Sequence, residues 1–297
     1  ILKDLSGIEK AVSDYRKGYH DYFARVSAAL KVQRVELDGT PRVVLIPGVG
    51  LVGIGTSSEA ARIASDIYEH TVVVIEAAES YGRYQPLPEN DLFSMEYWSL
   101  EQAKLGKGKA LPLEGQVCLI TGAGSGIGAQ TARVFSQAGA QLVLWDIVED
   151  RLDEVRRSLA HPARSHIESV DVTQQEKILK ALGHAVDMFG GLDIVISNAG
   201  KAWTSDMSEC SREMLRESFE LNFYAHQYLA AGAVGIMKRQ GLGGCLLFNA
   251  SKSAFNPGPN FGPYSLPKAA VVALMKQYAV EGGARGIRSN AVNADRI

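Results

Sequence analysis

The sequence predicts an α/β protein whose larger part is a doubly wound parallel sheet, preceded by a smaller α/β segment. After residue 115, short apolar runs alternate with stretches long enough to form helices. The runs are unbroken, which is typical of strands buried on both faces. A glycine-rich turn follows the first run, as expected where a strand leads into a helix. The expected strands are 117–120, 142–145, 166–170, 194–197, 245–249 and 289–292.

The composition is that of a folded protein of about two domains. The chain has 297 residues, of which 46% are hydrophobic and 22% are charged. A net charge of −2 argues against a broad surface for nucleic acid, and no apolar run approaches the ~20 residues that cross a membrane. Cys118, Cys210 and Cys245 are widely spaced. We interpret them as free thiols in a reducing, cytoplasmic compartment.

The first part of the chain predicts helices around one hairpin. Apolar and aromatic residues recur at helical spacing over 5–31, which predicts a long helix. Asp38 and Gly39 are a favourable turn pair between the apolar runs 35–37 and 43–46, so we expect a hairpin there. The elements expected next are a structural glycine-rich turn over 48–55, a helix capped at 56–58 that runs to about residue 80, a loop over 82–88, a short helix over 95–105 and a linker over 106–112.

The glycine-rich turn of the larger part gives the first indication of a ligand. Glycines let the backbone turn tightly and approach a pyrophosphate, and the following helix N-terminus offers free N–H groups and a positive dipole end. Such a loop alone is weak evidence, because the turn over 48–55 is equally rich in glycine. The candidate cofactor-binding residues of this loop are Thr121, Gly122, Ser125, Gly126, Ile127 and Gly128.

Asp146 adds an independent indication. It ends the second strand of the larger part, 18 residues beyond Gly128. A carboxylate there accepts hydrogen bonds from the adenosine ribose hydroxyls and repels a 2′-phosphate. No Arg or Lys lies within 121–128 or directly after Asp146. The sequence therefore favours NAD over NADP.

Four residues form a candidate catalytic set. Tyr264 and Lys268 are four positions apart, so a helix would place both side chains on one face. A tyrosine is a poor base at its ordinary pKa of ~10, but a nearby ammonium stabilises the phenolate. Ser251, at the end of a predicted strand, could hold a substrate oxygen. Asn222, in a helical stretch, could support a water chain leading to Lys268.

The motifs of the larger part occur in the order of one enzyme family. They are the loop 121–128, Asp146, Asp171 with Val172, Asn198-Ala199-Gly200, Asn222, Ser251, Tyr264 with Lys268, and 290–293. On these motifs, residues 113–297 resemble the short-chain dehydrogenase/reductase family. The resemblance implies a Rossmann-type doubly wound sheet and hydride transfer between NAD(P) and an alcohol or a carbonyl.

The resemblance also implies a role for each residue. Tyr264 would be the acid/base, and Ser251 would position the substrate oxygen. Lys268 would bind the nicotinamide ribose and lower the pKa of Tyr264, while Asn222 would support the proton relay. Asp171 and Val172 would flank the adenine, and Asn198, Ala199 and Gly200 would line the central strand beside the cofactor.

Three sites depart from the family pattern. Ser197 replaces the first Asn of a common Asn-Asn-Ala-Gly pattern, and Lys252 follows Ser251 where many members have a small residue. Ala294 and Asp295 replace the usual Pro-Gly in a turn that borders the nicotinamide side of the site.

Segments 41–84 and 91–105 resemble the middle of bifunctional proteins that join a class II aldolase-like (adducin-like) region to a short-chain dehydrogenase. Those proteins are associated with rhamnose breakdown, through rhamnulose-1-phosphate aldolase and lactaldehyde oxidation. Class II aldolase chemistry needs a divalent metal held by several His residues and a carboxylate. The turn 46–51 lacks a His-His-Gly pattern, and His20 and His70 lie on separate predicted helices. We therefore predict no metal site.

The sequence predicts an NAD-dependent oxidoreductase that transfers a hydride between the cofactor and a small hydroxyaldehyde, sugar-derived alcohol or polyol. Lactaldehyde is the leading substrate, on the resemblance alone. Two alternatives stay open: a metal aldolase (lyase) activity of the parent fusion protein, and a non-catalytic NAD-binding module. The missing His cluster argues against the first, and the intact set of Ser251, Tyr264 and Lys268 argues against the second.

We expect a partial aldolase-like segment without a metal site over 1–105, a linker over 106–112 and an NAD-binding domain over 113–297. The last would lack the C-terminal substrate loop and final strand of its family. The expected partner is a small-molecule substrate, with no nucleic acid and no membrane. In the family, the helices that carry Asn222 and Tyr264 often pack across a two-fold axis, so we expect a homodimer or homotetramer.

Overall fold

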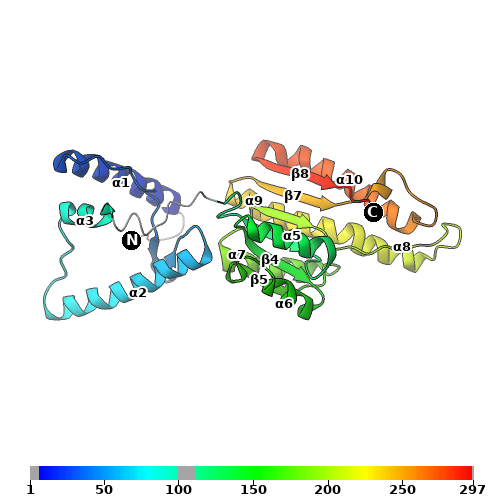
Figure 1. Cartoon of the computed structure of the whole chain (residues 1–297), viewed down its shortest axis with the longest axis horizontal. Coiled ribbons are helices and arrows are strands. Elements are labelled where there is room, and N and C mark those ends of the chain that lie inside the picture. Colours follow the sequence, from blue (N-terminus) through cyan, green and yellow to red (C-terminus); the bar gives the residue numbers. More distant parts are fainter. Residues whose placement is uncertain (1–6, 100–110, 296–297) are drawn as a thin grey trace. The chain divides into compact units, whose positions relative to one another are not determined.

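The computed structural model describes residues 7–99 and 111–295. The chain divides into two compact units, Ile1–Ala110 and Leu111–Ile297, which are described separately (Figure 1). The predicted linker residues 106–110 and the predicted helical residues 100–105 lie outside the described residues. None of the described helices combines the length and the apolar character required to span a bilayer.

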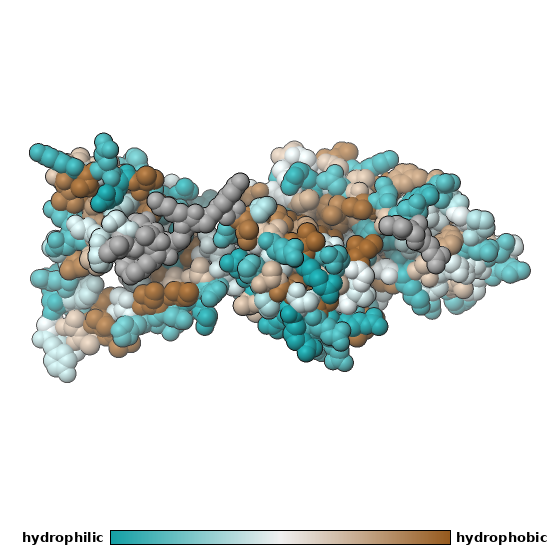
Figure 2. Space-filling view, in the orientation of Figure 1, coloured by the Kyte–Doolittle hydropathy of each residue, from teal (hydrophilic) through white to brown (hydrophobic). Residues whose placement is uncertain are grey.

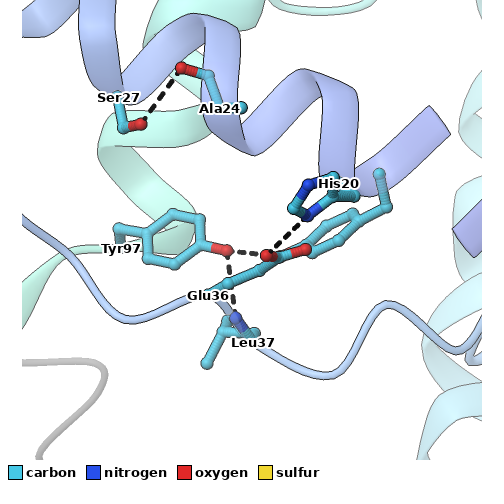
Figure 3. A network of polar contacts seen from close by, with 7 residues as sticks. His20, Ala24, Ser27, Glu36, Leu37 and Tyr97 are labelled. Atoms are coloured by element: carbon cyan, nitrogen blue, oxygen red, sulfur yellow. Dashed lines mark hydrogen bonds and ion pairs between the residues drawn. The ribbon is translucent and has the colours of Figure 1, made fainter. Parts of the chain in front are cut away.

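The first unit is built on helices and one antiparallel hairpin. A small core holds its first and last described helices together: Val26, Phe93 and Tyr97 are buried, and the rings of Phe93 and Tyr97 stack with centroids 4.4 Å apart. The hydroxyl of Tyr97 also accepts a hydrogen bond from the Leu37 N–H at 3.2 Å, which fixes the connecting segment against this core (Figure 3). The elements are α1 (Ile8–Leu30), β1 (Val43–Ile46), β2 (Gly50–Gly53), α2 (Ser58–Tyr81) and α3 (Glu89–Glu96).

Helix α2 begins as the sequence predicts but packs loosely. Ser57 is its N-cap, and its hydroxyl accepts a hydrogen bond from the Ala60 N–H at 3.1 Å. None of the residues of this fully described helix is buried, and Ile67 and Val73 are 64% and 61% exposed. Hydrophobic residues are correspondingly visible on the surface of this unit (Figure 2). The first unit therefore has a small core for its size.

One prediction for the first unit is wrong. The Asp38 carboxylate accepts hydrogen bonds from the N–H and hydroxyl of Thr40, at 3.0 and 2.8 Å, and forms a local turn without a hairpin. The hairpin lies one strand later, where β1 pairs with β2 and the turn uses Gly48 and Gly50 at φ 76° and 125°. Helix α3 begins directly after Pro88, whose fixed backbone suits a helix start, and it overlaps the predicted helix 95–105 only at Met95 and Glu96. Residues 100–105 of that prediction lie outside the described residues.

The second unit confirms the predicted doubly wound sheet. Its described residues form a six-stranded sheet in the order β5-β4-β3-β6-β7-β8, and every neighbouring pair is parallel. The order reverses between β3 and β6, and the carboxyl ends of strands at such a point form a ligand-binding crevice. All six predicted strands are present: β3 (Val117–Thr121), β4 (Gln141–Asp146), β5 (Ser165–Ser169), β6 (Ile194–Ser197), β7 (Gly244–Asn249) and β8 (Ile287–Val292).

Helices cover both faces of this sheet. Alternate residues of β3 belong to opposite cores: Leu119 packs in a cluster with α7, α9 and α10, and Cys118 and Ile120 pack in a cluster with α5 and α6. Both faces are thus buried, which explains the unbroken apolar runs. The helices are α5 (Gly126–Gln137), α6 (Glu149–Arg157), α7 (Gln175–Phe189), α8 (Arg212–Phe219), α9 (Ala225–Gln240) and α10 (Gly262–Gly282), with a π-helical turn at Glu220–Tyr224 and 3-10 turns at Pro162–Arg164, Lys252–Ala254 and Gly283–Arg285.

Within the glycine-rich loop, Gly128 packs directly against the backbone of Gly122. A Cβ at Gly128 would lie 2.1 Å from the Gly122 carbonyl oxygen, whereas a Cβ at Gly183 in α7 would meet nothing within 4 Å. We expect Gly128→Ala to lower the free energy of unfolding of the second unit by about 1–3 kcal/mol through overpacking. The matched Gly183→Ala should be neutral or raise it by about 0.5–1 kcal/mol. Urea unfolding followed by circular dichroism measures both, and equal behaviour of the two variants would contradict the packing described here.

Candidate active site

The glycine-rich loop of the second unit leads from β3 into α5 and leaves the start of that helix open. Gly122 and Gly126 have φ of 64° and 52°, which favour glycine. Ser125, the N-cap residue, is extended and makes no side-chain cap bond. A Cβ at Gly126 would meet nothing within 4 Å, so open space lies beside the helix start. The first N–H groups of α5 are therefore available to an anion, and the helix dipole favours one.

A cleft of ≈ 600 Å³ lies at the carboxyl ends of the strands, beside this loop. Its volume is typical of a site for a small ligand. Ten of the predicted cofactor-binding residues line it: Gly122, Ser125, Gly126, Ile127, Asp146, Asp171, Val172, Asn198, Ala199 and Gly200.

Thr121 and Gly128 do not line the cleft but hold its wall. The Thr121 hydroxyl accepts hydrogen bonds from the N–H groups of Asn198 and Ala199, at 3.0 and 3.1 Å. The Asn198 side-chain amide donates to the Thr121 carbonyl at 2.9 Å. These bonds join the end of β3 to the segment after β6, on the two sides of the point where the strand order reverses.

Asp146 is held by backbone donors at the edge of the cleft. Its Oδ2 accepts from the Gly124 N–H at 2.9 Å, and its Oδ1 accepts from the Val148 N–H at 3.1 Å. Arg151 also lines the cleft, although sequence reasoning considered only the residue directly after Asp146. The start of α6 at Glu149 folds the chain back and brings Arg151 to the same wall. The position of Arg151 beside Asp146 depends on this fold-back, so residues directly adjacent to Asp146 in the sequence do not indicate it.

Asp171 is likewise fixed by local donors. Its carboxylate accepts from the N–H and hydroxyl of Thr173 at 3.0 and 2.7 Å, and from the Gln174 amide at 2.7 Å. Burial raises the pKa of Asp171, but these hydrogen bonds outweigh burial and hold the pKa below its usual range. The side chain is therefore ionised at neutral pH.

The structure brings Ser251, Tyr264 and Lys268 together. Lys268 Nζ lies 5.7 Å from the centroid of the Tyr264 ring on α10. Burial raises the pKa of Tyr264, and a hydrogen bond with Ser251 acts in the opposite direction. Ser251 precedes the 3-10 turn Lys252–Ala254, and its Oγ accepts from the Ser253 N–H at 3.2 Å. A substrate oxygen placed between the two hydroxyls would have a donor on one side and an acid/base on the other.

Lys268 is almost completely buried, with 2% of its surface exposed. Its Nζ donates a hydrogen bond to the Asn249 carbonyl at 2.8 Å. Burial lowers the pKa of Lys268 from 10.5 to about 8. The side chain therefore changes charge near pH 8. Asn249 also lines the cleft, so Lys268 lies directly behind its wall.

Asn222 lies close to Lys268, with only Gly200 between them. A Cβ at Gly200 would be 2.8 Å from Asn222 Oδ1 and 3.4 Å from Lys268 Nζ. The buried Asn222 side chain accepts from the Lys201 N–H at 3.1 Å and donates to the Lys201 carbonyl at 2.7 Å. It lies in the π-helical turn, a distortion frequently found at functional sites.

The departures from the family pattern acquire partners in the structure. Lys252 and Asp295 form an ion pair at 2.9 Å, so two of the departures contact each other. Ser197 Oγ lies 2.6 Å from Nδ1 of His226, a buried residue that sequence reasoning did not single out. Its spacing from Asn222, four positions along a helical stretch, is the one sequence signal that places it beside the catalytic set.

Comparison with known families agrees with this architecture. The model of the short chain dehydrogenase family matches residues 116–296. The chain belongs to the short-chain dehydrogenase family. The model of the second domain of class II aldolases matches residues 2–105, so the predicted order of an aldolase-like region before a short-chain dehydrogenase is confirmed.

Relatives of this short-chain dehydrogenase include one that matches its whole length. An uncharacterized oxidoreductase, YuxG, of Bacillus subtilis (strain 168) is 32% identical over 305 residues, which cover 100% of this chain and 43% of the relative. The chain thus spans less than half the length of that relative. A short-chain type dehydrogenase/reductase from Mycobacterium marinum is 33% identical with a TM-score of 0.60, over 62% of this chain and 76% of the other.

A second similar solved structure is a complex with ligands. It is a 7α-hydroxysteroid dehydrogenase complexed with NADH and 7-oxo glycochenodeoxycholic acid, 29% identical with a TM-score of 0.59. The match covers 62% of this chain and 72% of that chain. At 29% sequence identity, the two proteins are similar in sequence as well as in fold.

The class II aldolase match raises the question of a metal centre. Within residues 7–99 and 111–295, no group of three or more His, Cys, Asp or Glu side chains is placed to hold a metal ion. His20 instead lies with its Nδ1 2.9 Å from a Glu36 carboxylate oxygen (Figure 3).

The buried Lys268 of this short-chain dehydrogenase should leave a pH signature on stability. Its pKa is about 8 in the folded chain against 10.5 when solvated, so the unfolded state binds more protons between these values. The free energy of unfolding therefore rises with pH from about 8 to 10.5, by roughly 3 kcal/mol for this group. Urea unfolding at pH 7.5 and 10.5 measures this. Between these pH values, the free energy of unfolding of wild type should rise relative to that of Lys268→Met by about 3 kcal/mol. A difference between the two proteins that does not change with pH would contradict the burial of the charged amine.

Proposed function

We propose that the chain is an NAD-dependent oxidoreductase that transfers a hydride between a small hydroxyaldehyde, sugar-derived alcohol or polyol and the nicotinamide cofactor. The observation that supports this proposal most is the close approach of Ser251, Tyr264 and Lys268 to one another, with Lys268 against the wall of the cleft. Asn249 and Gly200 line that cleft, and both lie against Lys268. These contacts support a role for Lys268 beside a cofactor bound in the cleft.

The residues of the cleft fit a dinucleotide. The open N-terminus of α5 suits its pyrophosphate, and Asp146 suits its adenosine ribose hydroxyls. Lys268 would hold the nicotinamide ribose. When bound, the cofactor supplies the carbon that accepts or donates the hydride.

The side chains of this chain would then handle the proton. Tyr264 takes the proton from the substrate hydroxyl during oxidation and returns it during reduction. Ser251 holds the substrate oxygen. The Lys268 ammonium favours the phenolate of Tyr264, against the burial that raises its pKa. Asn222, held by the backbone of Lys201, supports the relay that replaces the proton. Oxidation should accelerate as pH rises toward the pKa of Tyr264.

Two further features of the proposal come from similarity. The 7α-hydroxysteroid dehydrogenase with NADH supports a nicotinamide cofactor, and Asp146 supports NAD in particular. The class II aldolase match, placed before a dehydrogenase, supports a substrate from carbohydrate metabolism such as lactaldehyde. A cytoplasmic homodimer or homotetramer belongs to the same proposal. The lyase alternative has the aldolase family match in its favour, but no ligand group for its metal among the described residues.

Removal of the Tyr264 hydroxyl tests the proposed acid/base. We expect Tyr264→Phe to lower turnover by about 10²–10⁴-fold, because a general acid/base contributes that much. Hydroxyaldehydes and polyols, lactaldehyde among them, are screened with NAD by absorbance of the reduced cofactor, and NAD binding is titrated in parallel. Retained turnover in the variant would exclude Tyr264 as the acid/base. Binding of NAD by wild type without turnover on any alcohol would favour a non-catalytic module.

Asp146 and Arg151 together offer a test of cofactor choice. The Asp146 carboxylate would repel a 2′-phosphate, while the Arg151 guanidinium on the same wall would attract one. We expect Asp146→Ala to bind NADP at least about tenfold more tightly than wild type does, because one repulsive charge is removed. The double variant Asp146→Ala/Arg151→Ala should lose most of that gain. An unchanged NADP affinity in Asp146→Ala, by fluorescence titration of the reduced cofactors, would exclude Asp146 as the discriminating residue.

A further inference from the structure

His226 is a buried titratable residue that the proposed chemistry does not use. It lies on α9, directly after the π-helical turn that carries Asn222, and only 1% of its surface is exposed. Its Nδ1 lies 2.6 Å from Ser197 Oγ, and its Nε2 lies 3.4 Å from Lys268 Nζ. The imidazole therefore bridges the end of β6 to the lysine on α10.

The protonation of this imidazole follows from its partners. An ammonium has only donors, so Nε2 must offer its lone pair to a charged Lys268. The single hydrogen of a neutral ring then sits on Nδ1 and is donated to Ser197 Oγ. Burial and the charge of Lys268 both lower the pKa of His226 well below its usual range, so the ring is neutral. The electrostatics thus gives a neutral ring, and the positions of its two partners give the tautomer.

Ser197 takes part in this arrangement through its departure from the family pattern. It stands at the end of β6, and it is buried with 4% of its surface exposed. A hydroxyl can accept from Nδ1 at short range, which fixes the orientation of the ring. The serine and the histidine therefore form one unit.

We propose that His226 is a positioning residue that holds the Lys268 ammonium through Nε2, with Ser197 fixing the tautomer of its ring. The inference rests on the proposed role of Lys268. With the Asn249 carbonyl and His226 as acceptors, two of the three N–H groups of Lys268 are occupied. The third is left for the cofactor ribose or the relay at Asn222.

Loss of the Nε2 acceptor has a predictable direction. A hydrogen bond to the charged form of a lysine favours that form, so its removal lowers the pKa of Lys268 below about 8. Less ammonium then remains at pH 8 to favour the phenolate of Tyr264, and the pH profile of oxidation moves to higher pH. Among the described residues, the titratable groups facing this pair are Lys268 for His226 and Tyr264 for Lys268. The neighbours on β6, β7 and the π-helical turn, namely Ser197, Asn249 and Asn222, are neutral.

Two polar variants separate positioning from packing. In His226→Gln the side-chain amide reaches the place of Nε2 and keeps an acceptor for Lys268. In His226→Asn the shorter amide reaches only the place of Nδ1 and keeps the contact with Ser197. We expect His226→Asn to oxidise alcohol about tenfold more slowly at pH 8, and His226→Gln to stay within about threefold of wild type. His184→Asn, on an exposed histidine of α7, is the matched control and should be unchanged.

A second readout does not need turnover. In protein labelled with ¹³C at lysine Cε, the Lys268 signal is assigned by its loss in Lys268→Met, and its titration gives the pKa. We expect a lower value in His226→Asn and nearly the wild-type value in His226→Gln. The proposal would be overturned if Lys268 titrated with its wild-type pKa in folded His226→Asn. It would also be overturned if the pKa of Lys268 shifted equally in both variants. If His226→Asn does not fold, Ser197→Ala carries the test, and an unchanged Lys268 titration there would equally overturn it. Absence of turnover in wild type would refute the proposed function and leave this titration decisive for His226.

Discussion

The burial of the Lys268 ammonium is the constraint on which the candidate site depends. A charge removed from water must find acceptors within the protein, or the group gives up its proton. Here the acceptors come from different parts of the fold: the Asn249 carbonyl at the end of β7 and the His226 ring on α9. Gly200 leaves room for Asn222 beside them, because a Cβ there would lie 2.8 Å from Asn222 Oδ1. Strand β7 and helices α9 and α10 thus meet at a single nitrogen atom.

The strand ends are joined to one another by side chains as well as by the sheet. The Asn249 amide donates to Asn198 Oδ1 at 2.8 Å, and Asn198 in turn donates to the Thr121 carbonyl. These two hydrogen bonds link the ends of β7, β6 and β3 across the crevice where ligands bind in folds of this type. The wall of the cleft and the lysine behind it are therefore parts of one connected polar network.

The sequence predicted the second unit well because its signals are local and repeated. Buried parallel strands give unbroken apolar runs, which predict the sheet. The motif residues fall at the ends of these runs, so the same pattern also indicated the candidate site. It failed where a short-range preference competed with a longer-range contact. Asp38 and Gly39 are a good turn pair, but Leu37 is held by Tyr97, sixty residues away, and Asp38 bonds to Thr40. Arg151 and His226 were missed for another reason: helical folding brings them to the site from positions that linear adjacency does not indicate.

A neutral acceptor beside Lys268 serves this site better than a carboxylate would. A carboxylate at position 226 would pair with the ammonium, hold its pKa high and cancel much of its field at Tyr264. An apolar residue would leave the buried ammonium short of an acceptor and lower its pKa further. The imidazole, kept neutral by burial, supports the charge without neutralising it. Under the proposed function, Lys268, whose pKa is lowered by burial to about 8, would direct its charge toward the phenolate of Tyr264.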